Sequence, residues 1–233
     1  MDFSREMRRN PKLISRHFKQ KKMLINCSLS VLYKRPNSNT MKKNFLGILF
    51  SITVLAIPSF AQLEMPPHIK DKITYPVLDF HPWVGVIPIE NPAIPYDPSL
   101  DYKVAIDLYG KVKDSTAVHP VILEVARTYN LGIANGVPPE KLKIAGIFHG
   151  GITSAIFSDE EYEKKYGIPN PNLPAIQKLK EVGVEFYICG QSMAFWNHTK
   201  EQITPLVPQV MSAKYAFITL DQKGYSYLNV SED

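Results

Sequence analysis

Cys189 carries the most reactive side chain in the part of this sequence that we expect to remain after processing. A thiolate is a nucleophile, and the pKa of a thiol falls near a helix N-terminus or a cation. If residues 191–196 begin a helical turn, Cys189 faces unpaired amide donors, and Gly190 lets the backbone come close enough to hold an anionic sulfur. Free cysteines are also among the most often buried residues, so a structural cysteine at a strand end is the alternative.

His149 is the second candidate for chemistry, as a base or proton partner for the Cys189 thiol. Gly150 and Gly151 follow it, which suits either a tight turn or a backbone approach to an anion; a hydrogen-bonded turn histidine is the alternative. Asp107 ends an otherwise apolar run, where a buried acid is unfavourable unless it is paired. We expect it either to orient His149 or to cap a helix.

Further candidates are the residues that follow predicted strands, where ligands bind in open parallel sheets. Gln191 and Ser192 belong to this group, although they could also simply cap the helix after the cysteine. The predicted ligand-binding set is Asp107, Tyr109, Gly150, Gly151, Gly190, Gln191 and Ser192. Ser212, at the end of the fourth predicted strand, lies on the same rim.

Several established motifs are missing from the sequence. It has no GxxxxGK[ST] phosphate loop, no GxGxxG after the first predicted strand, no paired cysteine motif and no GxSxG. The other histidines of the presumed mature chain are scattered: His68, His81, His119 and His198. We therefore predict neither a metal site nor a cofactor.

The segments that must position these residues alternate between strand and helix. Short apolar or β-branched runs predict strands at 103–108, 143–148, 184–188, 209–212 and 225–229. Helical spacing predicts helices around 118–129, 158–166, 172–182, 199–207 and 213–220, with Asn172 as an N-cap. This alternation predicts an α/β fold with a mostly parallel five-stranded sheet and helices on both faces.

The N-terminus predicts export. Residues 1–40 are a basic leader, either disordered or upstream of the true start, and residues 41–61 have the features of a Sec-type signal peptide. Lys42 and Lys43 precede an apolar run, and Pro58 closes that run before the roughly 20 residues that a membrane-spanning helix needs. We expect a periplasmic or secreted protein with no stable membrane insertion after cleavage.

The remaining sequence predicts an arm and one domain. Residues 62–100 contain eight prolines but also many apolar side chains, so we expect an extended arm that packs on the domain or on a neighbouring subunit. Residues 101–230 form the α/β domain, a normal size for a single domain. With Cys27 in the leader, Cys189 has no partner for an internal disulfide.

The charge distribution argues against nucleic acid as a partner. The whole chain has a net charge of +5, but residues 1–40 hold ten Lys/Arg and only two acids. With Lys42 and Lys43 also removed, residues 62–233 carry a net charge of −5 and no concentrated basic stripe. Binding to phosphates needs clustered Lys and Arg.

Four motifs in a fixed order carry a resemblance to a known family. They are GIFHGG at 146–151, NPN at 170–172, VGVEFYICGQS at 182–192 and LDQKGY at 220–225. Together they resemble the DsrE/DsrF-like family, over about residues 101–230.

This resemblance implies a three-layer α/β/α domain, which in this family commonly assembles into trimers or hexamers. Some family members pass sulfur between proteins as a persulfide on a cysteine, and by resemblance that position is Cys189 here. His149 belongs to a motif of the exported branch of the family.

Two hypotheses follow. The first is a periplasmic sulfur-handling protein that carries sulfane sulfur as a persulfide on Cys189, with a protein donor or acceptor as its partner. The second is a non-catalytic, oligomeric module that binds a small ligand. A thiol peroxidase is less favoured because no resolving cysteine is present.

Overall fold

The computed structural model describes residues 65–230. The predicted basic leader and signal peptide lie outside the described residues. Among the helices of residues 65–230, none is both long and apolar enough to cross a membrane.

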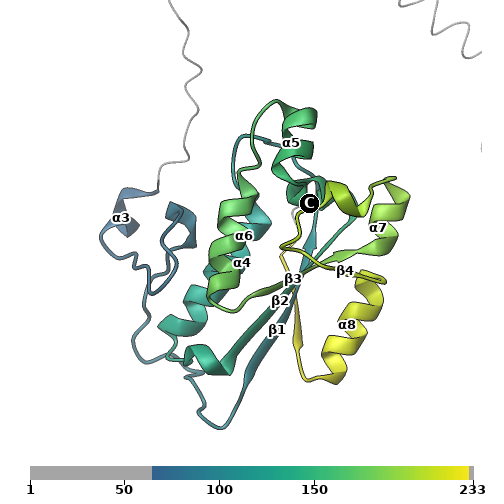
Figure 1. Ribbon diagram of the computed structural model, residues 1–233. Coiled ribbons are helices and arrows are strands. Elements are labelled where there is room, and N and C mark those ends of the chain that lie inside the picture. The colour runs from purple at the N-terminus through teal and green to yellow at the C-terminus, as the bar shows by residue number, and fades with distance from the viewer. Residues whose placement is uncertain (1–64, 231–233) are drawn as a thin grey trace, which may run out of the picture. The chain divides into compact units, whose positions relative to one another are not determined.

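A five-stranded parallel sheet forms the centre of the domain (Figure 1). Its strand order is β4-β3-β2-β1-β5, and every neighbouring pair is parallel. The central strand β2 is buried from Ile144 to Phe148, as expected for a parallel strand that is covered on both faces. The strands are β1 Tyr102–Tyr109, β2 Leu142–His149, β3 Glu185–Cys189, β4 Gln209–Val210 and β5 Ser226–Asn229. The predicted three-layer parallel fold is therefore confirmed.

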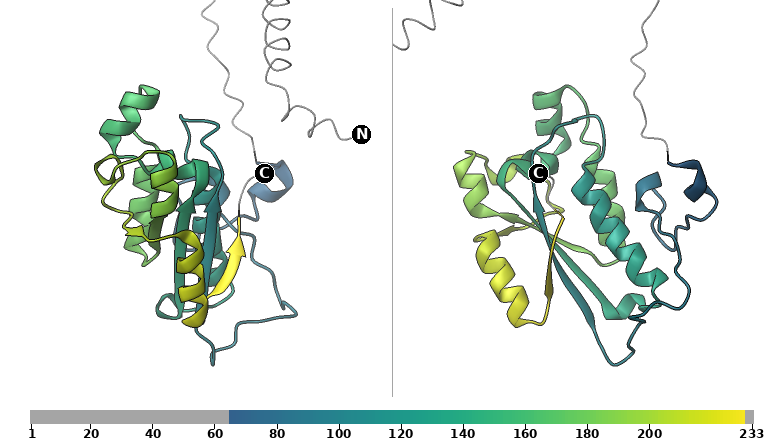
Figure 2. Two further views of the ribbon diagram at one scale, coloured as in Figure 1. Left: turned by 90° about the vertical axis from the view of Figure 1, so that its right-hand side faces the viewer. Right: turned by 180° about the vertical axis from the view of Figure 1, so that it is seen from behind.

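Helices cover the two faces of the sheet unequally (Figures 1 and 2). Helices α4 Pro120–Ala134 and α6 Asn172–Glu181 pack on one face and contribute to the main apolar core. Helix α8 Ala213–Gln222 covers the other face, where the buried cluster consists of only Ile147, Cys189 and Ala213. Cys189 therefore belongs to the smaller of the two buried clusters, on the face of the sheet that α8 covers.

Shorter helices follow the strands at their carboxyl ends. The 3-10 helix η3 Gly150–Ile156 follows β2 and leads to α5 Asp159–Tyr166, and α7 Gly190–Phe195 follows β3. The helix predicted at 199–207 is wrong: only the 3-10 turn η4 Lys200–Gln202 forms there. Pro205 explains this, because proline lacks an N–H and disfavours helical geometry in the residue before it.

The Pro-rich arm packs on the domain, which is one of its two predicted locations. It contains the short helices α3 Pro67–Lys70 and η1 Pro82–Val84. The buried amide of Asn130 on α4 anchors it, donating to the carbonyls of Leu78 and Val84 and accepting from the Leu78 N–H. The arm therefore covers the outer side of α4 (Figure 1).

The NPN motif is a buried hydrogen-bond network. The side-chain amide of Asn170 donates to the carbonyls of Ala155 and Phe157, and its oxygen accepts from both the backbone and the side chain of Asn172. The side-chain oxygen of Asn172 accepts from the backbone N–H of His119, at the start of α4. The prediction that Asn172 caps α6 is wrong, because Asn172 is the first residue of that helix and Pro171 is the N-cap. This motif joins η3, α6 and α4.

Candidate functional site

The strand register makes Cys189 and His149 neighbours. Phe148 on β2 is paired with Ile188 on β3, so the residues that follow each of them lie side by side on adjacent strands. Parallel strands lie about 4.8 Å apart, and directly neighbouring residues point to the same face. The thiol and the imidazole therefore lie on the α8 face at the carboxyl edge of the sheet, on neighbouring strands, and both line one pocket.

Asp107 and Tyr227 continue this row across the next two strands. Tyr109 on β1 is paired with His149, and Asp107 lies two residues earlier, on the same face. Tyr227 on β5 is paired with Ala105, again two residues earlier. Four adjacent strands, β3, β2, β1 and β5, thus place Cys189, His149, Asp107 and Tyr227 on one face.

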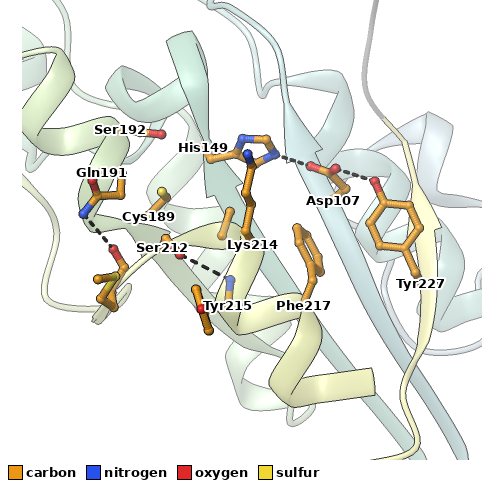
Figure 3. Close-up of a pocket in the computed structure, with 12 residues that line it drawn as sticks. Asp107, His149, Cys189, Gln191, Ser192, Ser212, Lys214, Tyr215, Phe217 and Tyr227 are labelled. Carbon is orange, nitrogen blue, oxygen red and sulfur yellow. Dashed lines mark hydrogen bonds and ion pairs between the residues drawn. The ribbon is translucent and has the colours of Figure 1, made fainter. Parts of the chain in front are cut away.

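The carboxylate of Asp107 joins His149 to Tyr227 (Figure 3). Its Oδ1 lies 2.5 Å from Nε2 of His149, and its Oδ2 accepts from the Tyr227 hydroxyl at 2.5 Å. Burial alone would raise the pKa of Asp107, but the hydrogen bonds from His149 and Tyr227 outweigh burial, and the pKa is lowered. The same hydrogen bond raises the pKa of Tyr227 to about 12. Asp107 is therefore an ionised acceptor and Tyr227 a neutral donor.

Cys189 is surrounded by donors that favour its thiolate. Burial raises the pKa of the thiol, but hydrogen bonds from the Ser192 hydroxyl and from the backbone N–H groups of Ala213, Ser192 and Gln191 outweigh it, so the pKa is lowered. The Ser192 hydroxyl accepts from the N–H of Gly150 at 2.9 Å, which leaves its own proton for the sulfur. The residue is 5% exposed, and the pocket that it lines gives access to its sulfur.

The donors come from the starts of two helices. Cys189 is the N-cap residue of α7, and Ala213 is the first residue of α8. The side chain of Ser212 caps α8 by accepting from the N–H of Tyr215 at 3.2 Å. The first amides of a helix lack partners within the helix, so amides from both helices are available to the sulfur.

A pocket of about 720 Å³ opens over this row of side chains (Figure 3). Figure 3 shows the imidazole of His149 with Asp107 on one side and with Cys189 and Ser192 on the other. The lining residues are Asp107, His149, Cys189, Gln191, Ser192, Met211, Ser212, Ala213, Lys214, Tyr215, Phe217 and Tyr227. The volume is in the range of small-molecule sites in proteins.

Comparison of the sequence with models of known protein families identifies the family of this chain. The model of the DsrE/DsrF-like family matches residues 113–230, about half of the chain. This chain belongs to the DsrE/DsrF-like family. The matched region contains His149, Cys189 and Tyr227 but begins after β1, so Asp107 lies outside it.

Solved structures that are similar to this chain include a protein of unknown function, MTH1491, from Methanobacterium thermoautotrophicum, with 18% identity and a TM-score of 0.40. The similarity covers 55% of this chain and 99% of that one. A search of functionally curated proteins gave no significant match.

Five of the predicted site residues of this DsrE-like domain line the pocket: Asp107, His149, Cys189, Gln191 and Ser192. Of the others, Tyr109, Gly150 and Gly190 contact residues of the lining, whereas the neighbours of Gly151 lie outside the lining. Tyr109 packs against His149, with ring centroids 5.1 Å apart, and Gly190 lies against the backbone carbonyl of Val210. Gly150 has a φ of +73°, which brings its N–H to Ser192 and its Cα against the Tyr109 ring. Gly151 packs against Lys111.

The alternatives for Asp107 and Ser192 are now distinguishable by their contacts. Asp107 pairs with His149 and Tyr227 and caps no helix, whereas the Ser192 hydroxyl bonds across to η3. The side-chain amide of Gln191 donates to the carbonyl of Met211, at 3.4 Å.

Sequence reasoning missed most of the α8 and β5 contribution to the pocket. Tyr227 lies in a strand that was predicted, but its position next to β1 depends on a strand order that the sequence does not specify. Lys214 and Phe217 lie in the helix that begins just after Ser212. Because Ser212 was expected on the rim at the end of the fourth predicted strand, the start of this helix could have been expected there as well.

Proposed function

We propose that this protein carries sulfane sulfur as a persulfide on Cys189. The observation that carries the proposal is the set of four hydrogen-bond donors around the thiol, which lowers its pKa where it opens into a pocket. A thiolate attacks sulfane sulfur, and donors that stabilise the thiolate increase the fraction of Cys189 that can attack.

The pocket has room for the product and for a sulfur donor or acceptor. A persulfide adds one atom to Cys189, whereas the pocket measures about 720 Å³. The part of the chain that the structure describes contains no second cysteine, so a persulfide on Cys189 is not resolved into a disulfide within residues 65–230. A single thiol of this kind fits a carrier that exchanges sulfur with another molecule.

We further propose that the carrier is exported, on the strength of residues 41–61, and that it works as a homo-oligomer. Apolar side chains on and beside α8 support self-association or docking of a protein sulfur donor or acceptor. Met211 is 72% exposed, Tyr215 67% and Ile218 54%. Exposed apolar side chains gathered in this way are typical of interaction surfaces.

A non-catalytic module that binds a small ligand is the second candidate. The size of the pocket and the apolar side chains of Met211 and Phe217 in its wall favour it. In that case Cys189→Ser would leave ligand binding intact, whereas a sulfur carrier would lose its cargo.

Intact mass spectrometry of the exported protein tests the proposal. We expect an added mass of about 32 Da, one sulfur atom, that a reductant removes and that is absent from Cys189→Ser. The same spectrum reports the N-terminus and so tests cleavage after residue 61. The proposal fails if wild-type protein incubated with an organic persulfide never gains this mass.

A further inference from the structure

We infer that Asp107 and Tyr227 are positioning residues that bind His149 through Nε2 and leave its Nδ1 lone pair free beside the pocket that it shares with Cys189, so that His149 moves the proton during sulfur transfer. This inference rests on the proposed function, because the proton belongs to a thiol that accepts sulfur. Tyr227 is the unexpected member, since it comes from the last strand of the sheet.

The chemistry of the carboxylate fixes the direction of the hydrogen bonds. An ionised carboxylate only accepts, so the hydroxyl of Tyr227 and Nε2 of His149 must both donate to Asp107. A neutral imidazole carries one proton, and with that proton on Nε2 the lone pair is on Nδ1. Within residues 65–230, Nδ1 makes no hydrogen bond, whereas Nε2 lies 2.5 Å from Oδ1 of Asp107.

Tyr227 completes the support of this carboxylate. Without it, Asp107 would have one bonded and one free oxygen and could turn about its side-chain torsions. Bonded at both oxygens, it keeps a single orientation across three strands, β2, β1 and β5. A residue that orients the catalytic imidazole through its second nitrogen has a known physical role: it selects the tautomer and stabilises the imidazolium.

The groups around His149 are compatible with a proton carrier. Aromatic rings pack on it from two elements, Tyr109 with centroids 5.1 Å apart and Phe217 at 6.5 Å. The titratable and charged groups that face it come from four elements: Asp107 and Tyr109 on β1, Cys189 on β3, Lys214 on α8 and Tyr227 on β5. Asp107 is the acid in direct contact, and so the charge that would stabilise an imidazolium.

The inferred step balances without an external oxidant or reductant. Neutral His149 accepts the thiol proton of Cys189 at Nδ1, and the thiolate attacks the outer sulfur of an organic persulfide, R–S–SH. A sulfur–sulfur bond forms at Cys189, and the bond in the donor breaks with its electron pair on the inner sulfur. The R–S⁻ group then takes the proton from Nδ1, so Cys–SH and R–S–SH become Cys–S–SH and R–SH.

Three variants test the inference: Asp107→Asn, Tyr227→Phe and, as a matched control, Tyr187→Phe. Tyr187 also donates its hydroxyl to a carboxylate, that of Glu185 at 2.9 Å, but it lies outside the pocket lining. Nitrogen-15 NMR of the His149 imidazole reports the tautomer, and mass spectrometry follows the rate of sulfur uptake from a low-molecular-weight persulfide.

In wild type we expect the tautomer with the proton on Nε2. Asp107→Asn should move the proton to Nδ1 and slow sulfur uptake about 100-fold, in the range of general acid–base catalysis. Tyr227→Phe should populate both tautomers and slow uptake about tenfold, because it removes one hydrogen bond to a charged group. Tyr187→Phe should match wild type in both measurements.

The inference is overturned if Asp107→Asn and Tyr227→Phe keep the wild-type tautomer and the wild-type rate. Circular dichroism of each variant excludes loss of the fold as the cause of a slow rate. If wild type takes up no sulfur at all, the proposed function fails, and the tautomer measurement decides the positioning role independently.

Discussion

Two polar clusters follow the carboxyl end of β2, and they differ in how completely their groups are bonded. In the NPN network, the Asn170 amide uses both its donors and accepts two hydrogen bonds, and both ring nitrogens of His119 have partners. At the pocket, by contrast, Nδ1 of His149 makes no hydrogen bond within residues 65–230, and the sulfur of Cys189 faces open volume. Full satisfaction stabilises a fold, whereas unused bonding capacity beside a cavity is available to a ligand.

The largest effect on stability should come from the NPN network. Asn170→Ala leaves the buried carbonyls of Ala155 and Phe157 without their donor, and we expect the free energy of unfolding to fall by about 3 kcal/mol. Urea denaturation measures the change. Cys189→Ser is the comparison, with an expected loss below about 1 kcal/mol. Equal losses in the two variants would remove the distinction between the clusters.

A smaller loss of stability should follow substitution of Gly150, the glycine directly after β2. Gly150 has a φ of +73°, and a Cβ there would meet the ring of Tyr109. We expect Gly150→Ala to lower the free energy of unfolding by about 1–2 kcal/mol. Gly183 has a φ of +88° but open space around it, so Gly183→Ala in the same assay separates backbone strain from the clash.

The electrostatic difference between the clusters should appear in the reactivity of the thiol. Ser192→Ala removes a donor to Cys189, so the thiol pKa should move up toward its ordinary 9.0 and alkylation at neutral pH should slow about threefold to tenfold. Iodoacetamide labelling at several pH values measures it. Ser154→Ala, which removes a hydrogen bond to Tyr166 outside the pocket, should label at the wild-type rate.

The smallest effect concerns the dependence of stability on pH. Because the folded-state pKa of Asp107 is lowered, its stabilising contribution is fully present above the ordinary value of 3.8 and is lost as pH falls through the lowered value. Asp107→Asn should therefore reduce the loss of stability between neutral pH and about pH 2, and only modestly, because the Asp107 side chain, 13% exposed, lies at a pocket open to solvent that partly screens its charge. Thermal melts at the two pH values give the comparison, and identical slopes for the two proteins would contradict it.

The positions of the strands could be predicted from the sequence, whereas the order of the strands in the sheet could not. Apolar runs located all five strands, and the helices between them made parallel pairing the expected result. The pairing of β5 with β1 depends on long-range packing that no local pattern encodes, so Tyr227 was missed although its strand was predicted. Asn172 was assigned as a cap for a similar reason: its partner is His119, 53 residues away in the sequence.

Because Asn130 anchors the arm, the two faces of the domain differ: the α4 face is covered by the arm, and the α8 face contains the pocket. The arm occupies the outer side of α4, and three hydrogen bonds to a buried amide hold it there. That side of the domain is therefore already covered by the chain's own residues. The pocket that contains the sulfur is lined by α8, so under the proposed function a partner would reach Cys189 from the α8 side.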